Sequence, residues 1–195
     1  MDFAHEKSNA LRKIDKSSKK SIDKQIKSLV AEINKLSNFY TTSSCSGRFV
    51  IVKELGKKIK NAILLSYHGP PKLEVLLKDL MKILESNKQY LFFKYEPSIL
   101  HVVASSTEKA ARFVEIARQL GFKKSGFYFG RKRKRPVIEL ISTETLALPI
   151  AKNGKLLVSE KYLSLVLSLA KRLHEKNKKK IKKLGIELKN GDLDS

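Results

Sequence analysis

The residues best suited to chemistry lie in one short segment, residues 41–48, which reads Thr-Thr-Ser-Ser-Cys-Ser-Gly-Arg. Its hydroxyls donate and accept hydrogen bonds, Gly47 lets the backbone approach a ligand closely, and Arg48 offers a planar fork of N–H donors. The apolar run at residues 49–52 that follows is typical of a buried strand. The segment is therefore either a turn that fixes the entry into this strand or a loop that holds a ligand.

The only cysteine of the chain, Cys45, lies in the middle of this segment. A single cysteine cannot form an internal disulfide, which is typical of a reducing compartment. No second cysteine and no histidine stand at ligand spacing, so no metal site is expected. A nucleophilic thiol needs an activating base, which the sequence does not place. Cys45 is therefore interpreted as a small packing or ligand-contact residue.

The chain is strongly basic. Its 195 residues include 41 Lys and Arg against 19 Asp and Glu, which gives a formal net charge of +22. This excess favours a nucleic-acid partner, because each phosphate contact releases counterions and adds affinity. No apolar run approaches the ~20 residues that a membrane span requires, and the N-terminus lacks the apolar core of a signal peptide. A cytoplasmic protein without membrane contact is therefore expected.

Two regions concentrate the positive charge. A run of five basic residues is either a solvated hairpin tip or a clamp on RNA phosphates, and the net charge favours the clamp; the run is Arg131, Lys132, Arg133, Lys134 and Arg135. Lysines of the expected C-terminal helix, Lys179 and Lys180 among them, are assigned the same role. Phe127, Tyr128 and Phe129 could stack on bases, although strand alternation places Phe127 and Phe129 on one face, where core packing is expected.

Apolar periodicity and turn residues predict the secondary structure. Helices are expected within residues 8–36 and over residues 72–86, 107–120 and 160–183, with Thr107 as an N-cap. Strands are expected over residues 48–54, 62–67, 90–94, 99–105, 122–130, 136–142, 146–150 and 155–158. Residues 37–47 are predicted to form a loop, and residues 185–195 a frayed tail.

This order of elements indicates an α+β fold, in which helices pack on a large mixed sheet. At this length we expect a single domain over residues 1–195, whose last part, about residues 160–195, is the basic helix and its tail. No Gly-x-Gly-x-x-Gly sequence follows a strand, and no phosphate-binding Gly-Lys-Ser/Thr loop occurs. A Rossmann-type nucleotide-binding sheet is therefore not expected.

Five sequence blocks resemble the tRNA wybutosine-synthesis methyltransferases of the third pathway step. The Ser-Ser-Cys-x-Gly-Arg sequence at residues 43–48 is similar to the hallmark of that family. The other blocks follow in the family's order, and they are an apolar run ending in His68, Phe-Lys-Tyr-Glu-Pro-Ser-Ile-Leu-His-Val at residues 93–102, Leu-Gly-Phe-Lys-Lys-Ser-Gly at residues 120–126, and the Pro…Gly…Val…Tyr element at residues 149–162.

The resemblance implies an S-adenosylmethionine-dependent enzyme that methylates the ring nitrogen at position four of a tricyclic guanosine derivative, next to the anticodon of phenylalanine tRNA. Because the Gly-x-Gly-x-x-Gly fingerprint is absent, such an enzyme would bind its cofactor without it, in a fold unlike that of the Rossmann methyltransferases. Residues implied to hold the cofactor or the base's amino-carboxypropyl arm are Ser43, Ser44, Cys45, Gly47, Arg48, Ser125 and Gly126. A ring nitrogen that bears a proton must lose it on methylation, and His68, His101 and Glu96 are the base candidates.

Two positions depart from the family's pattern: Ile63 stands where a Trp is frequent, and Ile141 where an Arg is frequent. Isoleucine suits a strand at both positions. The alternative to an enzyme is a non-catalytic RNA-binding module, in which the Ser-Ser-Cys segment is structural. The two hypotheses differ in whether S-adenosylmethionine stabilises the protein against heat. The oligomeric state does not follow from the sequence.

Overall fold

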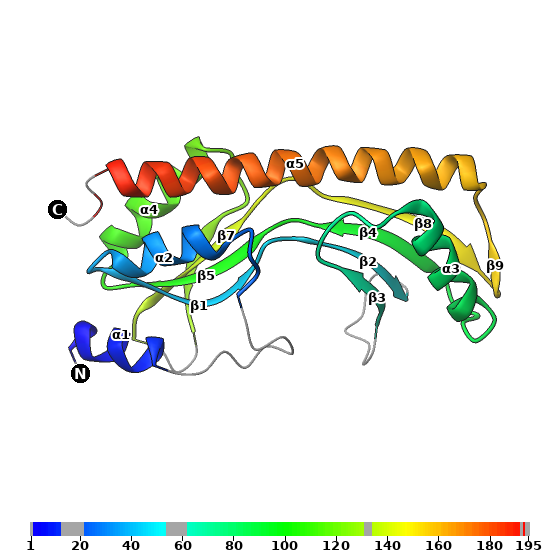
Figure 1. Cartoon of the computed structure of the whole chain (residues 1–195). Coiled ribbons are helices and arrows are strands. Elements are labelled where there is room, and N and C mark those ends of the chain that lie inside the picture. Colours follow the sequence, from blue (N-terminus) through cyan, green and yellow to red (C-terminus); the bar gives the residue numbers. More distant parts are fainter. Residues whose placement is uncertain (1, 13–21, 54–61, 131–133, 192, 194–195) are drawn as a thin grey trace. The chain divides into compact units, whose positions relative to one another are not determined.

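A computed structural model describes residues 2–12, 22–53, 62–130, 134–191 and 193. The chain divides into two compact units. Unit 1 comprises Met1–Ser46, Ser98–Thr143 and Asn177–Ser195, and unit 2 comprises Gly47–Pro97 and Glu144–Lys176. Figure 1 shows the helices and strands along the chain. The prediction of a single domain stays a prediction.

Unit 1 contains a four-stranded sheet in the order β1-β5-β7-β6, and every pairing in it is antiparallel. The strands are β1 (Phe39–Cys45), β5 (Ile99–Ala104), β7 (Pro136–Ile141) and β6 (Gly126–Phe129). One face of this sheet packs on α2 (Lys27–Lys35), α4 (Thr107–Gln119) and the later turns of α5 (Glu160–Asn190). On the other face, Phe3 of α1 (Phe3–Leu11) packs on Tyr40, Val103 and Val137.

Unit 2 contains a five-stranded antiparallel sheet in the order β3-β2-β4-β8-β9. The strands are β2 (Arg48–Lys53), β3 (Ile63–Tyr67), β4 (Leu91–Glu96), β8 (Leu146–Lys152) and β9 (Lys155–Leu156). One face of this sheet carries Phe49 of β2 and Phe93 and Tyr95 of β4, which are buried in a hydrophobic core. Residues of α3 (Leu73–Leu84) and of the early turns of α5 complete this core. The Tyr67 hydroxyl donates to Asp79 Oδ2 at 2.9 Å, which ties the end of β3 to α3.

The predicted α+β class is confirmed, and the expected large mixed sheet takes the form of two antiparallel sheets in the described residues. The predicted loop over residues 37–47 is wrong, because residues 39–45 form β1. The frayed tail is wrong as well: α5 continues to Asn190, since Leu188 and Leu193 are buried in the core of unit 1. Ser106, and not Thr107, is the N-cap of α4 and accepts from Lys109 N–H at 3.3 Å.

The strand expected over residues 122–130 is shorter than predicted. Residues 122–125 form a turn, in which Ser125 N–H donates to the Phe122 carbonyl at 3.0 Å, and only Gly126–Phe129 form β6. In the described part of the chain, no helix combines the length and the apolarity that a membrane crossing demands.

Candidate functional site

A β-bulge at Thr42 decides how the Ser-Ser-Cys side chains point. Thr41 pairs with Val102, but the next pair joins Ser43 to His101, so Thr42 is an extra residue in β1. The Thr42 hydroxyl lies 3.4 Å from the His101 carbonyl. Because directly paired residues share a face of the sheet, the bulge turns Ser43 and Cys45 towards the face that carries His101.

Four paired residues form a row across the sheet of unit 1. Ser43 pairs with His101, His101 with Glu139, and Glu139 with Gly126. Ser43 Oγ lies 2.7 Å from His101 Nδ1, and Glu139 Oε1 lies 3.1 Å from His101 Nε2. The side chains of His101 and Glu139 are 27% and 41% exposed, so this polar row is accessible to a ligand. A Cβ placed on Gly126 would meet nothing within 4 Å, so the end of the row is open.

The hydrogen bonds of the row fix the proton positions on neutral His101. An ionised carboxylate can only accept, so the contact with Glu139 places the ring proton on Nε2. Nδ1 then carries a lone pair and accepts from the Ser43 hydroxyl. The row is therefore arranged to move a proton from Ser43 to the imidazole, while the carboxylate stabilises the imidazolium that forms.

The remaining sequence candidates in unit 1 lie around this row. Cys45 pairs with Ile99, which pairs with Ile141, so these three residues form the next row of the sheet. Ser44 pairs with Leu100 and is turned to the core side of the sheet. In the described residues, no three His, Cys, Asp or Glu side chains gather as a metal site would require.

Ser125 is buried and its hydrogen bonds hold neighbouring strands and α4 together. Its hydroxyl accepts from Ile141 N–H at 3.0 Å, and its carbonyl accepts from Arg118 Nε at 2.9 Å. Gly126, the next residue, also borders a groove of about 520 Å³ beside α4, together with Phe127 and Arg118. Phe127 pairs with Ile138, whose side chain is in the core, so this groove lies on the face away from His101.

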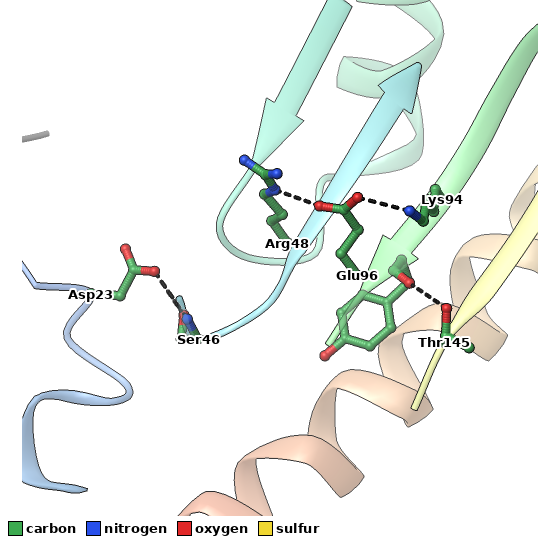
Figure 2. Close-up of polar contacts among 7 residues, drawn as sticks. Asp23, Ser46, Arg48, Lys94, Glu96 and Thr145 are labelled. Atoms are coloured by element: carbon green, nitrogen blue, oxygen red, sulfur yellow. Dashed lines mark hydrogen bonds and ion pairs between the residues drawn. The ribbon is translucent and has the colours of Figure 1, made fainter. Parts of the chain in front are cut away.

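In unit 2, Arg48 and Glu96 are directly paired and form an ion pair. Arg48 Nε donates to Glu96 Oε2 at 2.7 Å, and Lys94 Nζ donates to Glu96 Oε1 at 2.9 Å. Figure 2 shows that the contact with Glu96 runs through Nε of Arg48 and not through its two terminal nitrogens. Burial alone would raise the pKa of Glu96, but the hydrogen bonds and charges of Lys94 and Arg48 outweigh it and lower that pKa. The cluster therefore carries one positive charge beyond its internal pairing.

The backbone just before Arg48 is held by buried hydrogen bonds of unit 1. Asp23 Oδ2 accepts from Ser46 N–H at 3.2 Å and from the Ser46 hydroxyl at 3.1 Å, as Figure 2 shows. Asn177 Nδ2 donates to the Ser46 carbonyl at 2.8 Å. Gly47 follows with a φ of 100°, a conformation that glycine adopts without strain. Gly47 is thus required for the shape of the chain at the end of the motif.

The three base candidates differ in their surroundings. His101 belongs to the polar row of unit 1, and Glu96 to the ion-pair cluster of unit 2. His68 is half-buried and directly follows β3, whose last residue Tyr67 pairs with Phe49, so it lies at the same end of β2 as Arg48. Sequence reasoning missed Glu139; a single carboxylate within an apolar strand at residues 136–141 is the signal that points to it.

The basic residues have mixed environments. Arg131, Lys132 and Arg133 lie outside the described residues, while Lys134 and Lys179 are exposed. Arg135 Nη1 donates to the Ser105 carbonyl at 2.8 Å and the guanidinium lies 5.6 Å from the Phe3 ring, so it secures α1. Lys180 Nζ donates to the Gly121 carbonyl at 3.0 Å and to Thr143 Oγ1 at 2.8 Å, which favours a structural role.

The expected core packing of two aromatic residues is wrong. Phe127 and Phe129 are 36% and 55% exposed, and Tyr128 between them is 48% exposed. β6 is the last strand of its sheet and is short, so no element of the described residues covers these rings completely. His174 is buried between Phe49 and Tyr95, with its ring centroid 5.5 Å from that of Phe49.

Two antiparallel α+β units with an accessible Ser–His–Glu row define a protein outside the parallel nucleotide-binding folds. Comparison with known proteins then gives the family: this chain belongs to the family described as methyltransferase TYW3, whose model matches residues 5–190. It is similar to a protein of Thermococcus sibiricus named tRNA(Phe) 7-((3-amino-3-carboxypropyl)-4-demethylwyosine(37)-N(4))-methyltransferase, with 34% identity over 96% of this chain and 94% of the relative.

Other relatives span eukaryotes and archaea. The tRNA wybutosine-synthesizing protein 3 homolog of Xenopus laevis is 34% identical over 92% of this chain and 71% of that protein. Among solved structures, the PH1069 protein from Pyrococcus horikoshii superimposes with a TM-score of 0.85 and 30% identity, covering 96% of this chain and 94% of the other. The similarity therefore extends over both units.

Proposed function

We propose that this chain is an S-adenosylmethionine-dependent methyltransferase that methylates N4 of 7-(3-amino-3-carboxypropyl)-4-demethylwyosine at position 37 of tRNA(Phe) in the cytoplasm. Membership of the TYW3 family and the names of relatives such as the Thermococcus sibiricus protein support this function. They favour an enzyme over the alternative, a non-catalytic RNA-binding module. The observation that carries the chemistry is the row Ser43–His101–Glu139.

N-methylation of this base requires removal of the proton on the ring nitrogen. When bound, S-adenosylmethionine supplies the methyl group as an electrophile on a sulfonium. The ring nitrogen of the target nucleobase gives its proton to Ser43 Oγ, while the hydroxyl proton of Ser43 passes to His101 Nδ1. Glu139 stabilises the imidazolium that forms on His101. The products on the protein side are a neutral Ser43 hydroxyl and a charged His101, which returns its proton to water afterwards.

Among the three base candidates, this geometry favours His101. Glu96 is held by two cations that lower its pKa, which makes its carboxylate a weaker base. His68 lies at the end of β3, and Tyr67 before it is fixed by its hydrogen bond to Asp79. His101 has both a hydroxyl that relays a proton and a carboxylate on the other ring nitrogen.

The polar groups present fit the donor's chemistry. S-adenosylmethionine ends in an amino acid, and the substrate base carries a second amino-acid arm. In unit 2, the two terminal nitrogens of Arg48 that the Nε contact with Glu96 does not use match a carboxylate, and the excess positive charge of this cluster favours one. The carboxylate of Glu139 and the hydroxyl of Ser43 match hydroxyl or amino donors, and the open space at Gly126 admits a ligand. We assign Cys45, which lies in the neighbouring row of the unit 1 sheet, to the edge of the Ser43–His101–Glu139 site.

The test measures transfer of labelled methyl from S-adenosylmethionine to tRNA(Phe) from cells that lack this step, with the unmodified transcript as control. Label should enter only the modified tRNA. His101→Gln should lower kcat by about 100-fold or more, because a general base contributes roughly 10²–10⁴ in rate. His5→Gln, at an exposed histidine of α1, is the matched control and should retain wild-type kcat.

Two results would count against the proposal. Label in neither tRNA, with tight tRNA binding, would favour the RNA-binding module. A folded His101→Gln variant with a kcat within about threefold of wild type would remove His101 as the base, and Glu96→Gln and His68→Gln would then be compared in the same assay.

A further inference from the structure

Tyr128 is the exposed end of a second row on the face that carries the Ser43–His101–Glu139 row. It pairs with Val137, which pairs with Val103, which pairs with Tyr40. Phe3 of α1 packs on the other three members and buries them, whereas Tyr128 remains 48% exposed. The sheet thus presents one accessible aromatic ring on this face of its edge strand.

Tyr128 lies close to the polar row. It is two residues from Gly126, the member of that row in β6, and the register places both on the same face. Two residues of a strand span about 7 Å, so a planar group stacked on Tyr128 lies beside a group placed over His101 and Glu139. At this distance, the ring of Tyr128 can stack on the nucleotide next to the one that reacts over His101 and Glu139.

The charges nearby favour a nucleic acid over an apolar protein partner. Lys123 and Lys124 are exposed in the turn before β6, from which Ser125 separates them, and Lys134 beyond the strand is exposed too. An exposed aromatic ring among lysines combines the two contacts of a site for single-stranded nucleic acid, which are stacking on bases and attraction of phosphates. A partner with an acidic backbone and unpaired planar bases fits both.

We propose that Tyr128 stacks on a base of the unpaired RNA segment that carries the target nucleotide, and so holds the target over Ser43, His101 and Glu139. This rests on the proposed function for the identity of the RNA. The ring of Tyr128 offers a π-face that any base accepts, so the contact positions the strand and does not read its sequence.

The same strand supplies a matched control. Phe129 pairs with Pro136 and lies on the opposite face from Tyr128, although it is exposed to a similar degree, 55%. Replacement of Phe129 removes an exposed aromatic ring from β6 without touching the face of the polar row. The proposal therefore requires the two positions to behave differently.

The experiment measures the Kd of fluorescently labelled tRNA(Phe), lacking the methylation, for the full chain in the absence of S-adenosylmethionine. Tyr128→Ala should weaken binding by about 5- to 150-fold, the range for loss of one stacked base. Tyr128→Leu keeps apolar bulk and should show the same loss, whereas Tyr128→Phe keeps the ring and should bind within about twofold of wild type. Phe129→Ala should bind like wild type.

Unchanged binding by folded Tyr128→Ala and Tyr128→Leu would overturn the proposal, as would an equal loss in Phe129→Ala. A self-associated wild type that Tyr128→Ala converts to monomer, with RNA affinity unchanged, would show that a second copy covers the strand and would also overturn it. The binding assay needs no methyl transfer. An inactive wild type that still loses affinity through Tyr128→Ala would therefore refute the proposed function and leave the stacking contact supported.

Discussion

Asn177 holds the backbone at Ser46, next to the Ser-Ser-Cys sequence, and its contribution to the stability of the fold can be tested directly. Its side chain is fully buried in unit 1 and makes three hydrogen bonds. Oδ1 accepts from Ser98 N–H at 3.2 Å and from the Ser98 hydroxyl at 2.8 Å, and Nδ2 donates to the Ser46 carbonyl at 2.8 Å. Ser46 and Ser98 are buried as well, so water does not readily replace these partners.

Asn177→Leu keeps the number of side-chain heavy atoms and the branch at Cγ, and it removes all three hydrogen bonds. Each buried group left without a partner costs about 2 kcal/mol, and burial of the apolar side chain offsets about 2 kcal/mol of the total. We therefore expect the free energy of unfolding to fall by about 4 kcal/mol. In a chain of this length that lowers Tm by roughly 8–16 °C.

Urea unfolding followed by circular dichroism gives the free energy, and a thermal scan gives Tm. Lys179→Leu, on the exposed side of the same helix, is the control and should stay within about 0.5 kcal/mol of wild type. Asn177→Asp keeps the acceptor towards Ser98 but loses the donor to Ser46, so it should fall between the two. A loss below about 1 kcal/mol in Asn177→Leu would refute the reasoning, since Ser46 and Ser98 would then have found other partners.

Two further predictions concern single contacts. Because the pKa of Glu96 is lowered in the folded protein, its carboxylate stabilises the fold above the unfolded pKa of about 4.3, and this contribution is lost as pH falls through the folded pKa. Wild type should therefore resist urea better than Glu96→Gln at pH 7, with the difference vanishing in strong acid; a difference independent of pH would contradict this. Ser106→Ala should lower the free energy of unfolding in urea by about 1 kcal/mol, because α4 loses its N-cap, and Ser106→Asp should restore most of this stability. An Ala variant as stable as wild type would show that the N-cap hydrogen bond does not stabilise the fold.

The parts of the fold with a clear period were predictable from the sequence. α3 has buried leucines at positions 76, 80 and 84, and the partly buried Leu73, Leu77 and Ile83 pack on the same core. This mixture of three- and four-residue spacings fits one face of a helix and not the strict alternation of a strand. β1 has no such pattern, because its polar residues occur on both faces and its bulge breaks the alternation. It forms through pairing with β5, some 60 residues further along, which local periodicity does not report.

The candidate site shows the same division. The importance of His101 and of the Ser-Ser-Cys motif was visible in the residue types and in the family resemblance. The choice of Ser43 over Ser44 as the neighbour of His101 depends on the single extra residue at Thr42. Glu139 reaches His101 only through the register of β5 and β7, and no spacing in the sequence encodes that register.

The division of α5 between the two units has a consequence for synthesis of the protein. Leu163, Val166 and Ala170 complete the core of unit 2, whereas Ile181, Leu184 and Leu188 complete that of unit 1. A ribosome adding about 5–20 residues per second synthesises α5 only after every strand of both sheets. Neither hydrophobic core can therefore close before α5 has been synthesised. A chain truncated before residue 160 would expose apolar sheet faces in both units, so chaperones and proteases would meet two unfinished cores at once.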